Sequence, residues 1–193
     1  MEYDKSDQAM LLSIAAKSIQ HFLKFQEDYV VNTSEISAVL NQPAACFVTL
    51  MKQHQLRGCI GSLTARQALA YDVAENAKNA AFSDPRFPKL DEAEFPLLEI
   101  QISVLSKPEK MLFHSEEDLI NQIQPNIDGL ILQDKFNRST FLPTVWESLP
   151  DKKDFLTQLK RKAGLSENYW SDTLSVERYS TFCFGDEIKN ISK

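Results

Sequence analysis

Two short stretches of the chain, Cys46-Phe-Val-Thr-Leu-Met51 and Leu56-Arg-Gly-Cys-Ile-Gly61, decide its fold. The first stretch is apolar and contains β-branched residues, a composition typical of a strand. Residues 52–55 between them are polar and can close a hairpin, so that the chain returns through the second stretch. We therefore predict an antiparallel pair of strands that ends at Gly61.

Outward from this hairpin, the sequence predicts single helices mixed irregularly with short strands. Helical spacing, capping residues and breaks at prolines and glycines indicate helices from Ser6 to about Gln26, from a Thr64–Gln67 capping box to a break beginning at Ser83, from Ser115 to before Pro125, and from Asp151 to Gly164. Alternating or β-branched stretches indicate further strands at 97–105, 130–133, 140–142 and 176–184. Because the order lacks a regular βαβ repeat, it predicts an α+β fold with largely antiparallel sheets flanked by helices.

Composition narrows the classes of protein to which the chain can belong. With 193 residues, 43% hydrophobic and 25% charged, it suits one domain, or one domain with a smaller lobe. A net charge of −6 disfavours a nucleic-acid partner, and the absence of about 18 consecutive apolar residues disfavours a membrane span. The three cysteines are odd in number and far apart, and no signal peptide precedes the first helix. We therefore expect a soluble, cytoplasmic protein without disulfides.

The strongest candidate site is Arg57-Gly58-Cys59-Ile60-Gly61. In an extended strand Arg57, Cys59 and Gly61 share one face, and a guanidinium beside a thiol favours the reactive thiolate. Gly58 and Gly61 leave room for the close approach of a ligand or of another backbone. Alternatively, the glycines only mark a bulge, and Cys59 is a small buried hydrophobe.

Two further stretches supply candidate polar residues. The rigid Asp84-Pro85-Arg86-Phe87-Pro88 loop presents an acid and a base to a ligand, or its Asp84 and Arg86 pair internally to close a turn. On the alternating strand 97–105, Glu99, Gln101 and Ser103 share a face that lines a cleft or meets solvent. In the first case Glu99 acts as a general base or as the partner of an arginine.

Metal and cofactor motifs are weak. The three histidines have no metal-ligand spacing, and a site built from His54 and Cys59 needs further ligands brought in by the fold. No glycine-rich dinucleotide motif, phosphate-binding loop or nucleophile elbow occurs. We therefore expect no metal and no cofactor.

At these same residues the chain resembles the AMMECR family. The resemblance is carried, in the family's order, by 47–50, Leu56-Arg57-Gly58-Cys59-Ile60-Gly61, 81–90, Glu99-Ile100-Gln101-Ile102-Ser103-Val104-Leu105-Ser106, Asp128-Gly129-Leu130, Phe141-Leu142-Pro143-Thr144-Val145-Trp146 and Lys162-Ala163-Gly164-Leu165. It implies a single domain over residues 8–187, with tails at 1–7 and 188–193, and an AMMECR-like α+β fold in two unequal lobes with a cleft at the Arg-Gly-Cys-Ile-Gly stretch. One departure is Gln101, where the family often carries an acid.

The resemblance also implies a functional context. Bacterial members are called AmmeMemoRadiSam system protein A, and their expected partners are a MEMO-like protein and a radical S-adenosylmethionine enzyme. On this view Cys59, Arg57 and Glu99 are the catalytic candidates, and Gly58, Gly61, Asp84 and Arg86 are the ligand-binding candidates. The alternative is a non-catalytic binding or adaptor protein that recognises a peptide or a partner segment. Whether the chain is an enzyme stays open on the sequence.

Overall fold

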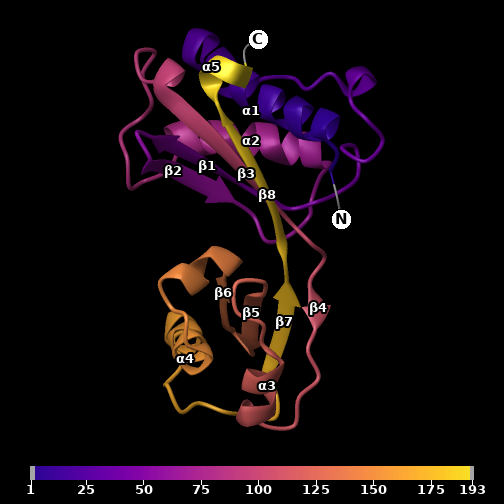
Figure 1. The fold of residues 1–193 in the computed structure, drawn as a ribbon, viewed down its shortest axis with the longest axis vertical. Helices are drawn as coiled ribbons and strands as arrows, with labels where there is room; N and C mark the ends of the chain where they lie inside the picture. The colour runs from indigo at the N-terminus through magenta and orange to yellow at the C-terminus, as the bar shows by residue number, and fades with distance from the viewer. Residues whose placement is uncertain (1–2, 192–193) are drawn as a thin grey trace. The chain divides into compact units, whose positions relative to one another are not determined.

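The computed structural model describes residues 3–191 and has the α+β fold expected from the sequence (Figure 1). The chain divides into two compact units. The first unit comprises Met1–Leu105 and Phe182–Lys193, and the second comprises Ser106–Thr181. Each unit has its own sheet and its own hydrophobic core.

The first unit is built on a four-stranded sheet in the order β2-β1-β3-β8. Its strands are β1 (Cys46–Lys52), β2 (Gln55–Gly61), β3 (Leu98–Leu105) and β8 (Thr181–Glu187). The helices are α1 (Lys5–Phe25), α2 (Leu69–Phe82) and the short α5 (Ile188–Ile191), with 3-10 turns η1 (Thr33–Glu35) and η2 (Phe95–Leu97). The predicted β1–β2 hairpin is present and is antiparallel, as is the β1–β3 pair.

One face of this sheet forms the core of the first unit. Alternation along β1 buries Cys46, Val48 and Leu50, and β3 buries Ile100 and Ile102 on the same side. Leucines, isoleucines and alanines of α1 and α2 complete this apolar cluster. The small alanines of α2 allow the helix to lie close to the sheet. The intervening residues of β1 and β3 therefore point to the opposite face.

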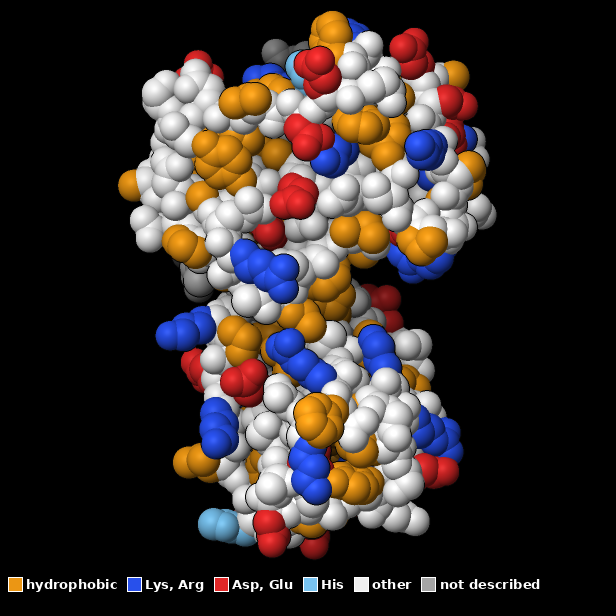
Figure 2. All heavy atoms as spheres, turned by 180° about the vertical axis from the view of Figure 1, so that it is seen from behind, with side chains coloured by type: hydrophobic (Ala, Val, Ile, Leu, Met, Phe, Trp, Pro, Cys, Tyr) orange, Lys and Arg blue, Asp and Glu red, His pale blue; other side chains and the backbone are white. Residues whose placement is uncertain are grey.

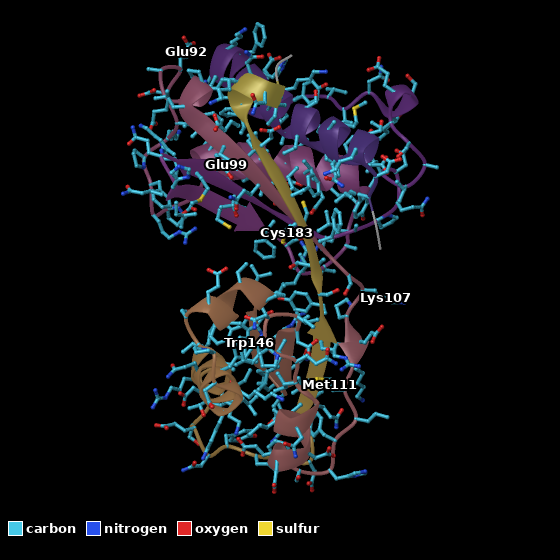
Figure 3. The ribbon with its side chains drawn as sticks, in the orientation of Figure 1. Glu92, Glu99, Lys107, Met111, Trp146 and Cys183 are labelled. Carbon is cyan, nitrogen blue, oxygen red and sulfur yellow. The ribbon has the colours of Figure 1, made fainter. Side chains whose placement is uncertain are left out.

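The second unit carries a sheet in the order β4-β7-β5-β6. Its strands are β4 (Glu109–Lys110), β5 (Gly129–Asp134), β6 (Asn137–Phe141) and β7 (Ser175–Tyr179). The helices are α3 (Glu116–Gln122) and α4 (Lys152–Lys162), and η3 (Pro143–Glu147) precedes α4. Trp146 stacks on Phe155 at a ring distance of 3.7 Å in the centre of this core (Trp146 is labelled in Figure 3).

Several predicted boundaries are wrong for identifiable reasons. Asp4, rather than Ser6, caps α1 by accepting a hydrogen bond from the Asp7 N–H. The Thr64–Gln67 capping box does not open α2, which begins at Leu69 without a side-chain cap. The strand predicted at 176–184 is two strands, because the chain leaves one sheet at Tyr179 and joins the other at Thr181.

Candidate functional site

Cys59 lies in a row of side chains across the first sheet. Thr49 of β1 pairs with Cys59 of β2 on one side and with Gln101 of β3 on the other. Paired residues project from the same face of a sheet, so the three side chains form one row, and Glu99 and Ser103 project beside it. We call the face that carries these five residues the thiol face. It is opposite to the face packed by α1 and α2, and Cys59 is partly exposed on it.

A β-bulge separates Arg57 from this row. Leu50 pairs with Gly58 and Met51 pairs with Leu56, so Arg57 is the extra residue between them. Its guanidinium donates to both carboxylate oxygens of Glu94, with Nε at 3.1 Å and Nη2 at 2.8 Å. Nη2 also donates to the Pro88 carbonyl at 2.9 Å. Arg57 therefore ties β2 to the loop that follows α2, and its guanidinium is bound away from the Cys59 thiol.

Glu94 is the centre of a clamp that consists of Arg57, Lys52, Glu94 and the Pro88 carbonyl. Lys52 donates to the same carboxylate at 2.7 Å, so two cations share one acid. The hydrogen bonds from Arg57, followed by those from Lys52, lower the pKa of Glu94 from 4.5 to about 2. The Arg57 side chain is only 9% exposed, and its Nη1 is buried with no hydrogen-bond partner among the described residues. A buried guanidinium makes the clamp depend strongly on its counter-charge.

Asp84 and Arg86 act on the backbone of Cys59. Asp84 accepts the Cys59 N–H at 2.9 Å, and Arg86 donates to the Cys59 carbonyl at 3.3 Å. Arg86 also donates to both Asp84 oxygens, and these bonds hold the pKa of that carboxyl well below its usual range. The Asp84 side chain is 2% exposed and that of Arg86 is 55% exposed. The pair is thus internal, as one of the two interpretations expected, but it leaves Arg86 reachable from solvent beside Cys59.

Both glycines of the motif have packing partners. A Cβ atom added to Gly58 would lie 2.1 Å from the Ala80 carbonyl oxygen of α2. A Cβ atom added to Gly61 would lie 2.4 Å from both the Phe47 ring and the Cys46 carbonyl oxygen. Close approach therefore explains Gly58 and Gly61, by α2 in the first case and by an aromatic ring in the second. Their predicted role in ligand binding stays a prediction.

The remaining polar residues of the thiol face are linked in pairs. The Thr49 hydroxyl donates to the Cys59 sulfur at 3.1 Å, and Gln101 donates to Glu99 at 2.7 Å. Ser103 lies 3.2 Å from the sulfur of Cys183 on β8. Figure 3 labels Glu99 on β3 and Cys183 on β8 within this sheet. The face thus presents hydroxyl, amide, carboxylate and thiol groups from four strands.

The described residues show neither a metal cluster nor a membrane-spanning helix. Within residues 3–191, no group of three or more His, Cys, Asp or Glu side chains is arranged to hold a metal ion. In the same described part of the chain, no helix is long and apolar enough to cross a membrane.

The sequence and the structure agree on where the candidate residues gather, but not on how they connect. Glu99, Gln101 and Ser103 share a face, as the alternation predicted, and the strand register adds Cys59 to that face, which the sequence did not predict. Arg57, predicted to share a face with Cys59, lies in a bulge instead. Glu94 was missed, because it lies 37 residues from Arg57 and no local pattern marks it. The arginine that contacts residue 59 is Arg86 rather than Arg57. Chemically, the arrangement presents the Cys59 thiol in a fixed polar surface, with Arg86 at its edge and Cys183 beside Ser103.

Known proteins resemble this chain along almost its whole length. The family model described as AMMECR1 matches residues 12–184. Protein SSO0193 of Saccharolobus solfataricus is 35% identical over 188 residues, covering 94% of this chain and 82% of that protein. A Methanothermobacter thermautotrophicus protein is 32% identical over 183 residues, covering 92% and 93%. The crystal structure of uncharacterized protein PH0010 from Pyrococcus horikoshii matches with a TM-score of 0.87 at 27% identity, covering 97% of this chain and 95% of that chain.

Proposed function

This chain belongs to the AMMECR1 family, and we propose that it acts as a protein-binding component of a multi-protein system, with the thiol face receiving a segment of a partner. The observation that carries this proposal is the fixed row of Cys59, Thr49 and Gln101. Strand pairing holds Thr49 from both sides, and Asp84 and Arg86 hold the backbone of Cys59. A preorganised surface loses little conformational entropy when a partner binds, which favours recognition.

One contact favours binding over nucleophilic catalysis by Cys59. Arg57, the residue expected to activate the thiol, has its guanidinium bound to Glu94 and Pro88. The Cys59 sulfur accepts a hydrogen bond from Thr49, which fixes the thiol in its position on the thiol face. A thiol placed in this way can contact a partner without a proton-transfer step.

We propose a MEMO-like protein and a radical S-adenosylmethionine enzyme as the partners, and the cytoplasm as the compartment. The support for these partners is the resemblance of the Leu56–Gly61 and 81–90 stretches to the AmmeMemoRadiSam component. The support for the compartment is that Cys46 and Cys59 are free thiols, which suits a reducing environment.

The second candidate function is a reactive thiol within the same system. The observation in its favour is that Cys59 is partly exposed and that Arg86, itself more than half exposed, contacts its backbone. In this reading Cys59 is modified during the reaction, and Glu99, Asp84 and Arg86 form the polar wall around it.

Binding of a purified MEMO-like protein, measured by calorimetry, tests the first proposal. Gln101→Arg places a long charged side chain on the thiol face, and we expect at least about a tenfold loss of affinity. The matched control is Gln20→Arg on the exposed surface of α1, which we expect to bind like the wild type. Equal binding by both variants would show that the thiol face is not the contact surface.

Modification of Cys59 during incubation with the partners separates the two candidate functions, and Cys59→Ser is the control. The binding proposal expects the serine variant to retain affinity for the partner, because the side chain keeps its size and polarity. The reactive-thiol proposal expects binding to persist while mass spectrometry finds residue 59 unmodified after incubation with both partners. If wild-type Cys59 also stays unmodified under those conditions, the reactive-thiol candidate is wrong.

A further inference from the structure

One end of the second unit combines an exposed aromatic tip with a pocket lined by both apolar and polar side chains. The register pairs Gln133 of β5 with Ser175 of β7, and Asp134 with Asn137 of β6. The β5–β6 turn and the start of β7 therefore lie at the same end of this sheet. Figure 1 shows β7 starting at this end, near α3.

The tip is the turn at Lys135 and Phe136. Lys135 adopts a left-handed backbone conformation with φ of 51°, and the turn directs Phe136 outward. Phe136 is 103% exposed, so the fold of the chain buries none of its ring. The neighbouring Lys135 and Arg138 are also exposed, which makes the tip aromatic and cationic.

The pocket lies between the segment that follows β4 and the segment that leads into β7. It has a volume of about 320 Å³ and is lined by residues 110–114 and by residues 170–172, 174 and 175. Phe113 and Trp170 face each other at a ring distance of 5.6 Å, and Leu112 forms an exposed apolar rim (79%). A cavity of about 150 Å³ in another protein holds a benzene ring. The pocket therefore has room for a phenylalanine side chain.

Hydrogen bonds to Asp134 hold one wall of the pocket in place. The buried carboxylate of Asp134 accepts hydrogen bonds from Tyr169, from Ser171 at 2.9 Å and from Thr173 at 2.6 Å. These bonds join the wall to the same β5–β6 hairpin that carries Phe136. The tip and the pocket thus belong to one rigid end of the unit.

The tip is cationic, and the rim of the pocket carries one acid with which it can pair. Asp172 lines the pocket, and exposed Glu117 lies on α3 close by in the sequence. Lys110 and His114 also line it, so the rim carries both signs. Figure 2 likewise shows hydrophobic side chains interspersed with Lys and Arg on one face of this unit.

We propose that this end is a self-association surface, on which Phe136 of each copy enters the pocket of a second copy of the chain. Because one chain carries both the tip and the pocket at the same end, a two-fold axis can place both contacts at once. Lys135 of one copy then pairs with Asp172 on the rim of the other. The inference is independent of the thiol face, which lies in the first unit.

Sedimentation equilibrium of the full chain over a range of concentrations tests this proposal. We expect a concentration-dependent dimer, and we expect Phe136→Asp or Leu112→Asp to raise its dissociation constant at least about tenfold. Both side chains are largely exposed, so neither change should disturb folding. The matched control is Ile127→Asp, 54% exposed at the opposite end of β5, which should leave the dimer intact.

Mixing the two variants provides a sharper readout. A Leu112→Asp copy still carries the tip, and a Phe136→Asp copy still carries the pocket, so the mixture keeps one of the two contacts. We expect it to associate more strongly than either variant alone. A wild-type monomer at all concentrations, a dimer unaffected by either variant, or a mixture no stronger than its parts would each overturn the proposal.

Discussion

Glu94→Gln tests whether the Arg57 clamp holds the candidate site together. Glutamine keeps the size and the oxygen acceptor of Glu94 but removes the charge that faces Arg57 and Lys52. Arg57 then stays buried without a counter-charge, a situation that commonly costs about 3–5 kcal/mol. We expect the free energy of unfolding of the first unit to fall by about 3 kcal/mol, the lower end of this range, because Glu94 keeps some contact with solvent (19% exposed).

The pKa of Glu94 gives an independent magnitude. Its value falls from 4.5 to about 2 on folding, and each pKa unit corresponds to about 1.4 kcal/mol. The ionised carboxylate therefore contributes about 3 kcal/mol to stability at neutral pH. Because the folded-state pKa is lowered, this contribution is present above pH 4.5 and is lost as the pH falls through 4.5 towards 2. The stability gap between wild type and variant should shrink to about 1 kcal/mol at pH 3.

Hydrogen exchange and urea unfolding followed by far-ultraviolet circular dichroism provide the assay. Exchange should accelerate in peptides that cover 55–61 and 83–95, since both ends of the clamp open together. The control is Glu92→Gln, an exposed neighbour, for which we expect a change within about 0.5 kcal/mol. Equal stability of wild type and Glu94→Gln at pH 7, or a gap that does not narrow at pH 3, would refute the clamp as described.

Three further perturbations have expected outcomes. Lys160→Ala removes a fully buried ammonium that binds Glu116 at 2.7 Å, and should lower the free energy of unfolding by about 3 kcal/mol. Fluorescence measures this change, because both tryptophans lie in the second unit. Gly58→Ala should cost about 3 kcal/mol in urea unfolding, because its Cβ would meet a backbone oxygen, whereas Gly164→Ala should cost about 1 kcal/mol, because only its φ of 78° opposes a side chain. In thiol labelling followed by mass spectrometry, exposed Cys183 should react in the native protein and Cys46 only after unfolding, since burial and Asp72 raise the pKa of the Cys46 thiol.

The sequence predicted the hairpin and the alternation along β3, because both depend on local pattern. A period of two along β3 places Glu99, Gln101 and Ser103 on one side. The position of Cys59 beside Thr49 and Gln101 depends on the register between strands, which the sequence alone did not predict. Arg57, predicted to share a face with Cys59, lies in a bulge instead.

Features that depend on long-range contacts could not be predicted in the same way. The bulge at Arg57 follows from its bond to Glu94, and the sequence gives no spacing rule for such a pair. The start of α2 at Leu69 was not predicted, because the Thr64–Gln67 capping pattern lies before the helix and does not cap it. The break at Ser180 also depends on tertiary structure, because residues 176–184 have continuous strand character although the strands on either side of it belong to different sheets.

The edges of the two sheets suggest how a partner would approach the thiol face. β2 is an edge strand, and at Cys59 its outward N–H and C=O are already bound by Asp84 and Arg86. At the edge strand β6, Lys162 similarly donates to the Thr140 carbonyl at 3.0 Å. Charged side chains at these positions block the addition of another strand. At the β2 edge, a partner of the first unit would therefore contact side chains across the sheet, beginning with Cys59, rather than add a strand to it.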